Sequence, residues 1–173
     1  MKKKILRNTN IKAWQGFAMM EVLIAVVILL VGILGLLGLQ AQGLKNNHSA
    51  YLKSQVVSLI DDMADRMRAN KTGLDSNRYA SIDTSSLSSD PGYDCITDYT
   101  GTSNGSSCNE DEIATYDIYA WGKTLASLLP SGYGKVVCND SPCVSGSTHT
   151  ITVLWDDRRT GSADTEFSVV FAL

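Results

Sequence analysis

Proline and histidine are scarce in this chain of 173 residues. No proline interrupts residues 17–70, and the two histidines, His48 and His149, are far apart. HExxH does not occur, and the GKT of residues 122–124 lacks the earlier glycine of a phosphate-binding loop. Hydrolytic triads and histidine metal sites need such clusters, so the sequence predicts no enzyme and no cofactor. The three prolines are Pro91, Pro130 and Pro142.

Acidic residues are missing from the first sixteen positions, which carry five basic ones. The remaining residues hold ten basic against eighteen acidic side chains, a net charge of −8. Because phosphate contacts need clustered Lys and Arg, this balance argues against nucleic-acid binding as a bulk property. The five basic residues are Lys2, Lys3, Lys4, Arg7 and Lys12.

Residues 17–39 form an apolar run with one charge, Glu21. At about 1.5 Å per residue the run makes roughly 35 Å of helix, enough to cross a membrane. The basic leader then places the N-terminus in the cytoplasm and the acidic body outside it. An ordinary secretory signal is the alternative, but no A-x-A cleavage motif follows the run.

The helical period continues beyond the run on one apolar stripe, so residues 40–70 predict an amphipathic second half. One proline-free helix of about 50 residues is therefore expected, ending at a stop signal at residues 70–73. Within it, Asp62 and Arg66 attract at a spacing of four, whereas Asp61 and Asp65 repel. Local pairing thus explains only part of the DDMADRMR segment.

The rest of the chain predicts a mixed domain. Residues 74–109 read as irregular loop with short strands, residues 110–129 as a second helix, and Val, Ile and Thr patterns as later strands. An antiparallel sheet packed on the amphipathic half of the long helix gives an α+β fold. Asn109 and the acids at residues 110–112 favour a helix start over a calcium site, and DDRRTGSAD favours a solvated hairpin turn. The strands are expected at 135–138, 148–155 and 166–173.

Four cysteines all follow the apolar run, an arrangement typical of an oxidising compartment and two disulfides. Three connectivities are possible. We favour Cys95 with Cys108 and Cys138 with Cys143, because each pair closes a short loop of Gly, Ser, Asn or Pro. A structural zinc site is the alternative, but its usual CxxC-like spacing is absent.

The order Gly16, Phe17 and Glu21, between a basic leader and the apolar helix, resembles a type IV prepilin signal. More closely, the segments LLGLQAQGLKNN, LIDDMADRMRAN, YDIYAWGKTLASLLPSG and ITVLWDDRR resemble the minor pilin family PilV, the type IV pilus modification proteins. The resemblance covers most of the chain, with little contribution from residues 74–109. It implies a type IV pilin-like lollipop, with a membrane helix and a globular head.

The resemblance also implies how the chain is processed. A prepilin peptidase would cut after Gly16 and methylate the new amino group of Phe17. That cut divides the chain into a leader (1–16), the transmembrane half of the helix (17–39), its amphipathic half (40–70) and a periplasmic head (71–173). Glu21 would then pair with an N-terminal ammonium, and the family favours that of a neighbouring subunit. A tolerated Glu that snorkels to the interface is the alternative.

Three glycines, Gly32, Gly35 and Gly38, lie on one face of the expected helix. They could permit close helix packing or local unwinding during assembly, or be merely tolerated there. Many major pilins carry a proline in this part of the helix, whereas this chain has none.

The resulting functional prediction is a minor pilin that initiates assembly of, or caps, type IV pili, with roles in twitching motility and adhesion. Its expected partners are the prepilin peptidase, other minor pilins, the major pilin and a tip adhesin. It is expected in the inner membrane with the head in the periplasm, and then in the pilus. The alternatives are a pseudopilin of a type II secretion system and a membrane-anchored periplasmic enzyme.

Overall fold

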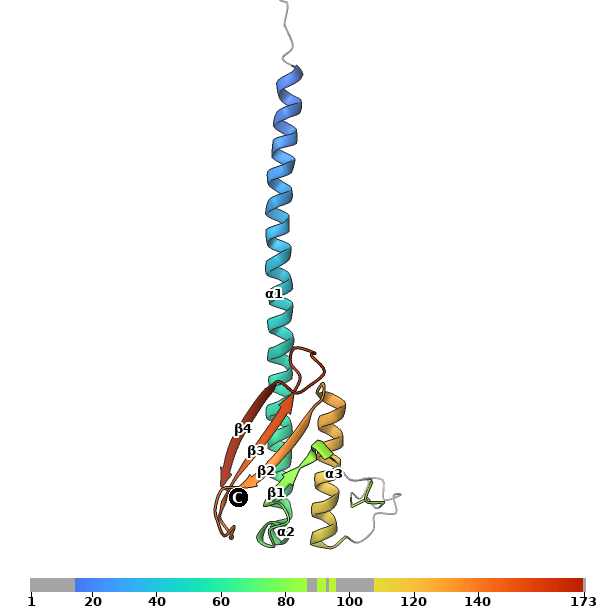
Figure 1. Ribbon diagram of the computed structural model, residues 1–173, viewed down its shortest axis with the longest axis vertical. Coiled ribbons are helices and arrows are strands. Elements are labelled where there is room, and N and C mark those ends of the chain that lie inside the picture. Colours follow the sequence, from blue (N-terminus) through green and yellow to red (C-terminus); the bar gives the residue numbers. More distant parts are fainter. Residues whose placement is uncertain (1–14, 87–89, 93, 96–107, 173) are drawn as a thin grey trace, which may run out of the picture. The chain divides into compact units, whose positions relative to one another are not determined.

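The computed structural model describes residues 15–86, 90–92, 94–95 and 108–172. Its first element is the helix α1, Gln15–Ala69, which runs for 55 residues without a break (Figure 1). The absence of proline allows this length, since an interior proline would remove a backbone hydrogen bond. The chain divides within α1, after Asn47, into two compact units.

The second unit, from His48 onward, holds every other element. The helix expected at 110–129 ends one residue earlier, and the strand expected from Lys135 begins two residues earlier, at Tyr133. One short strand is found in the region that reads as irregular. The elements are α2 Lys71–Asp75, β1 Ser81–Asp83, the 3-10 helix η1 Thr84–Ser86, α3 Glu110–Leu128, β2 Tyr133–Cys138, β3 Thr148–Trp155 and β4 Thr165–Ala172.

The strands form one antiparallel sheet in the order β1-β2-β3-β4, so each strand pairs with its neighbours in sequence. Val136 of β2 lies opposite Ile151 of β3, which lies opposite Val169 of β4. The register places these apolar side chains in a row across the sheet. The α+β class, with a long N-terminal helix, a second shorter helix and an antiparallel sheet, is confirmed.

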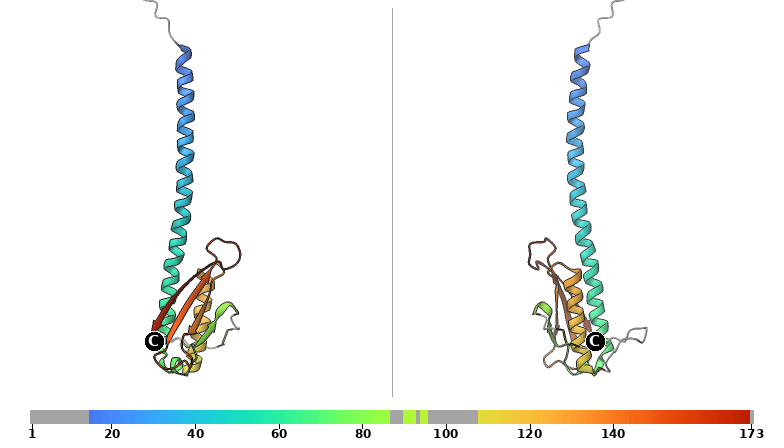
Figure 2. Two further views of the ribbon diagram at one scale, coloured as in Figure 1. Left: turned by 60° about the vertical axis from the view of Figure 1, so that its left-hand side comes forward. Right: turned by 90° about the vertical axis from the view of Figure 1, so that its right-hand side faces the viewer.

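One face of the sheet is covered by the end of α1 and by α3, which lie side by side (Figures 1 and 2). β3 alternates between buried and half-buried positions, as expected for a strand with one covered face. Its buried residues include Ile151, Val153 and Trp155, which join the core of the second unit.

The stripe of α1 that packs into this core has the three- and four-residue steps seen in the sequence. Trp121 of α3 fills the space beside it, and its Nε1 donates a hydrogen bond to the Leu59 carbonyl oxygen at 2.8 Å. On the sheet side, a Cβ on Gly134 would lie 2.1 Å from Cη2 of Trp121, so only glycine fits there. The α1 stripe consists of Leu52, Val56, Leu59, Ile60, Met63, Ala64 and Met67.

The helix ends confirm one expectation and correct part of another. α3 begins at Glu110 as expected, and the structure adds a capping box there, because Asn109 accepts from the Glu112 N–H and Glu112 accepts from the Asn109 N–H. The stop signal at 70–73 is only half right. α1 does end at Ala69, but Asn70 then caps α2 by accepting from the Gly73 N–H, so residues 71–73 are helical.

The turn between β3 and β4 is less solvated than its charges predict. Asp156 is only 2% exposed, and its carboxylate accepts from the N–H groups of Thr160 and Gly161. Its neighbours do form the expected local pairs, since Arg158 pairs with Asp164. The acid is buried because the backbone of its own loop satisfies it.

Candidate functional sites

The three residues of the predicted processing signal all lie on α1, which begins at Gln15. Residues four apart share a helical face, so Phe17 and Glu21 occupy the same side of α1. Glu21 is exposed and has no hydrogen-bond or ion-pair partner within the described part of the chain. Leader residues 1–14 and the side chains of Gly16 and Phe17 lie outside the description. Cleavage and methylation therefore stay predictions.

Glu21 lies at the start of a long apolar surface on α1. Met19 and the side chains that follow it are exposed on all sides of the helix, with Ile28 and Leu34 each 67% exposed. Among the described residues, α1 is the one helix long and apolar enough to cross a membrane. Such a surface needs lipid or other helices to cover it.

The three glycines of this surface leave their face of α1 open. A Cβ at Gly32, Gly35 or Gly38 would meet no other heavy atom within 4 Å. The helix is unbroken through all three positions. Their role in packing or unwinding stays a prediction, since their neighbours in an assembly would decide it.

A polar network closes the other end of α1. Arg66 donates to Asp62 Oδ2 at 2.9 Å and to Asp117 Oδ1 of α3 at 3.1 Å. The hydroxyl of Tyr79 donates to Asp117 Oδ2 at 2.8 Å, and the Asn70 amide donates to that hydroxyl at 3.1 Å. Asp117, Tyr79 and Asn70 are all buried. The network thus joins α1, α3 and the segment after α2.

This network shifts the titration of its members. Burial raises the pKa of Tyr79, and the charge of Asp117 raises it further. Burial alone would lower the pKa of Arg66, but the hydrogen bonds and charges of Asp62 and Asp117 outweigh it and raise the pKa. The Tyr79 hydroxyl therefore stays protonated, and Arg66 stays charged, throughout the physiological range. The network therefore stabilises the contact between α1, α3 and the segment after α2, and it is not a proton-transfer site.

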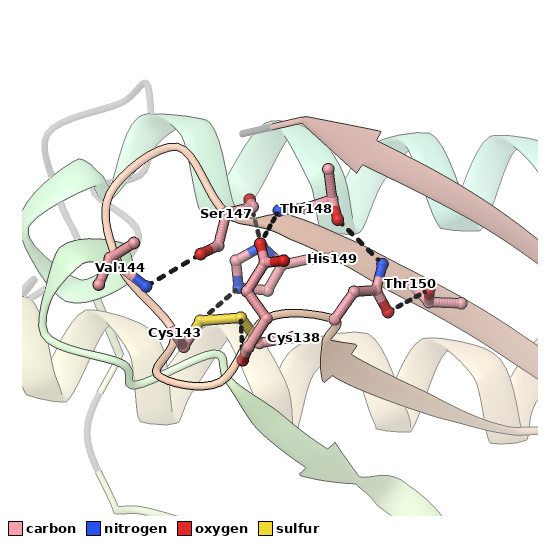
Figure 3. The surroundings of a disulfide bond; sticks show 9 residues. Cys138, Cys143, Val144, Ser147, Thr148, His149 and Thr150 are labelled. Carbon is pink, nitrogen blue, oxygen red and sulfur yellow. Dashed lines mark hydrogen bonds between the residues drawn. A yellow bond between two sulfur atoms is a disulfide. The ribbon is translucent and has the colours of Figure 1, made fainter.

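The cysteines form the two pairs that close short loops, Cys95 with Cys108 and Cys138 with Cys143. The first encloses residues 96–107, which lie outside the description. The second lies against His149, whose Nε2 is 3.7 Å from the Cys143 sulfur (Figure 3). His149 comes from β3 and is only 2% exposed.

One open pocket lies beside α3. Its lining residues include Asp94, Tyr116 and Tyr119. Burial raises the pKa of Tyr116, and the hydrogen bond and charge of Asp94 raise it further. The lining residues that the structure describes are aspartates, tyrosines and one glycine.

Sequence reasoning missed Asn70, Tyr79, Asp117 and His149. Asp117 carried the best available signal, because it is an acid at a buried position of an otherwise apolar helical stripe. A second signal was the charged segment around Arg66, because local pairing explained only part of its charges. No pattern in the sequence indicates that residues 66, 79 and 117 meet.

Comparison with protein-family models matches residues 38–119 to the Tt1218-like family, described as type IV pilin Tt1218. The match supports a type IV pilin in general and does not extend to PilV in particular. It begins after the predicted processing signal and includes the network of Arg66, Tyr79 and Asp117. Curated proteins and solved structures give no match to the chain.

Proposed function

We propose that the chain is a minor pilin of the PilV kind, which helps to initiate assembly of a type IV pilus or caps it. The observation that carries the proposal is α1, an exposed apolar helix whose only charge in residues 17–39 is Glu21, four residues after Phe17. The family match supports a pilin role in general. The initiating or capping role rests on the resemblance to PilV.

Processing follows from this proposal. A prepilin peptidase cuts after Gly16 on the cytoplasmic side and methylates the amino group of Phe17. The cut removes the five basic residues and leaves the apolar part of α1 intact. The membrane anchor is thus preserved while a new ammonium appears at its end.

Glu21 provides a partner for such an ammonium. A charged side chain inside a membrane costs about 2.5–3.5 kcal/mol at the helix centre, so an unpaired carboxylate is unfavourable there. Within a bundle of pilin helices, the Glu21 carboxylate pairs with the Phe17 ammonium of a neighbouring subunit, and each charge offsets the other. Other minor pilins and the major pilin supply these neighbours, and a tip adhesin is a further partner.

The mature N-terminus tests the proposal. Mass spectrometry of the protein isolated from its membrane should find a chain beginning at N-methylated Phe17. An N-terminus at Met1 in cells with an active prepilin peptidase, or one after residue 40, would contradict it. The first would show that the leader is not a prepilin signal, and the second would show an ordinary secretory signal.

Substituting Glu21 tests the pairing step. Glu21→Ala should leave cleavage intact but reduce incorporation into filaments by about tenfold or more, the effect of losing about 1.4 kcal/mol, because the neighbouring ammonium is left without its partner. Quantitative immunoblotting of sheared filaments against membranes measures the effect. Glu166→Ala is the matched control, because it removes an exposed acid from β4 and should incorporate normally. Normal incorporation of Glu21→Ala would refute the charge pairing.

Deleting the gene separates the proposal from a pseudopilin of a type II secretion system. Loss of surface pili and twitching with continued secretion supports the minor pilin. Normal pili with exported enzymes retained in the periplasm would instead favour the pseudopilin.

A further inference from the structure

The second disulfide forms part of a three-ligand cluster. The sulfurs of Cys138 and Cys143 and a ring nitrogen of His149 all lie within 4.8 Å of one another. Cys138 ends β2, Cys143 lies within the connection between β2 and β3, and His149 follows on β3 (Figure 3). Thiolate and imidazole are the ligands that zinc and related borderline or soft ions prefer.

The histidine is already oriented as a metal ligand. Its Nδ1 lies 3.2 Å from the Ser147 carbonyl oxygen, which can only accept, so Nδ1 carries the proton. In the neutral ring Nε2 then presents its lone pair to the Cys143 sulfur. A disulfide sulfur has no proton to donate, so this buried lone pair lacks a hydrogen-bond donor among the described residues. Metal-bound histidines are held in the same way, by a backbone carbonyl at the other nitrogen.

The distance between Cys143 and His149 suits a tetrahedral ion, whereas the two sulfurs are bonded to each other and must separate on reduction. Bond lengths of about 2.3 Å to sulfur and about 2.0 Å to nitrogen place the two ligand atoms about 3.5 Å apart in a tetrahedral zinc site. The distance between Cys143 Sγ and His149 Nε2 is 3.7 Å. The four residues between the cysteines, 139–142, are exposed, so the sulfurs can separate without disturbing the core.

We propose that Cys138, Cys143 and His149 form a binding site for Zn²⁺ or a similar thiophilic ion when their disulfide is reduced. The ion then replaces the disulfide as the cross-link of the β2–β3 connection. Three protein ligands leave a fourth position for water. This site is independent of the proposed pilin function.

The reduction step needs a dithiol reductant. The dithiol passes two electrons and two protons to the sulfur–sulfur bond and becomes a disulfide, which leaves two thiols on this chain. Binding of Zn²⁺ then releases the two thiol protons to water as two sulfur–metal bonds form. The Nε2 lone pair of His149 supplies the third bond, and no proton leaves the ring.

Thiol protection in the unsubstituted chain tests the proposal directly. The full chain in detergent micelles is reduced with a dithiol, freed of reductant without oxygen, and given one equivalent of Zn²⁺ before a short pulse of iodoacetamide. Zn²⁺ should slow alkylation of Cys138 and Cys143 at least about tenfold, because bound thiolates are shielded from attack. Cys95 and Cys108 serve as internal controls and should react unchanged, and Mg²⁺ should protect none.

Peptide mass spectrometry assigns each alkylated cysteine. Equal alkylation of Cys138 and Cys143 with and without Zn²⁺ would overturn the proposal. Equal protection of all four cysteines would do the same, because it would show unspecific thiol binding.

Substituting the histidine tests the third ligand. With Co²⁺ as the probe, the reduced chain should show a thiolate-to-cobalt charge-transfer band that saturates at one ion per chain. His149→Gln should weaken binding by about 10–100-fold or more, the range seen when even an outer partner of a ligand is lost. His48→Gln, at an exposed position on α1, is the matched control and should bind normally. If His149→Gln bound Co²⁺ as tightly as the control, His149 would not be a ligand. If that variant fails to fold, the alkylation result still decides.

Discussion

Asp117 is the residue at which three segments of the second unit meet. It accepts from Arg66 of α1 and from Tyr79, and its side chain is only 11% exposed. Removing an acceptor from such a position leaves both donors short of a partner. Asp117 therefore stabilises the unit through the groups around it, more than through one ion pair.

Asp117→Asn should destabilise the protein by about 1–3 kcal/mol, the usual cost of leaving a buried polar group poorly satisfied. The amide keeps the shape and one acceptor but loses the charge that faces Arg66. Urea unfolding of the full chain in detergent micelles, followed by tryptophan fluorescence, measures the change.

Asp65→Asn is the matched control for Asp117→Asn. Asp65 pairs with Arg68 at 2.8 Å, but its side chain is 75% exposed. Its loss should cost less than about 0.5 kcal/mol, as for most surface pairs. Equal effects of the two substitutions would show that the network contributes no more than a surface ion pair.

At the scale of elements, β1 has only three residues and depends on polar contacts at its end. Asp83 accepts from the Ser85 N–H and forms a salt bridge of 3.0 Å with Lys135 of β2. The Ser85 hydroxyl and N–H, followed by Lys135, lower the pKa of Asp83 from 3.8 to about 2. The folded state therefore favours the charged carboxylate at this position.

This shift has a definite pH signature. A folded pKa below the unfolded value gives stability that is fully present above about pH 4 and is lost as the pH falls toward 2. The difference in unfolding free energy between the unsubstituted chain and Asp83→Asn should therefore shrink across this window. Urea unfolding at several pH values measures it.

Ser85→Ala provides the comparison for Asp83→Asn. It removes the hydroxyl that contributes most to the low pKa, so it should weaken the acid dependence without abolishing it. A difference between Asp83→Asn and the unsubstituted chain that stays constant from pH 4 to 2 would contradict a lowered pKa.

Most elements could be predicted because their signals are local. The stripe of α1, the polar and acidic start of α3 and the alternation of β3 each depend on residues close in sequence. α2 could not be predicted, because Asn70 both follows one helix and caps the next. The burial of Asp156 was not predicted, because it depends on the N–H groups of Thr160 and Gly161, which donate to its carboxylate only in the folded loop.

At the scale of the molecule, every residue of the buried core belongs to the second unit. A fragment beginning at His48 should therefore fold, stay in solution without detergent and keep both disulfides. Near-ultraviolet circular dichroism and gel filtration check this outcome.

A shorter fragment beginning at Asp61 is the matched comparison. It lacks Leu52, Val56, Leu59 and Ile60, all buried in the core. Losing four such side chains costs about 6–12 kcal/mol, which is comparable to the total stability of most domains. Folding of this fragment, or aggregation of the one beginning at His48, would contradict the division of the chain.

The candidate sites also differ in how far they could be predicted from the sequence. Gly16, Phe17 and Glu21 could be named as a candidate site because they form one short motif in the sequence, and their role stays a prediction. The meeting of Arg66, Tyr79 and Asp117, and that of His149 with the second disulfide, could not. Both arise from tertiary packing, which brings together residues that no local period relates.

The contacts between α1 and α3 would carry load if the proposed filament were pulled. In a fibre that is pulled, a subunit held by its long helix passes the load to the rest of its second unit. Beyond the backbone link to α2, that load crosses through Arg66 and Asp117, through the Leu59 carbonyl and Trp121, and through the apolar core. The force that separates the sheet from α1 therefore depends on these side-chain contacts, together with those of Ser49 with Asp157 and of Arg68 with Phe171.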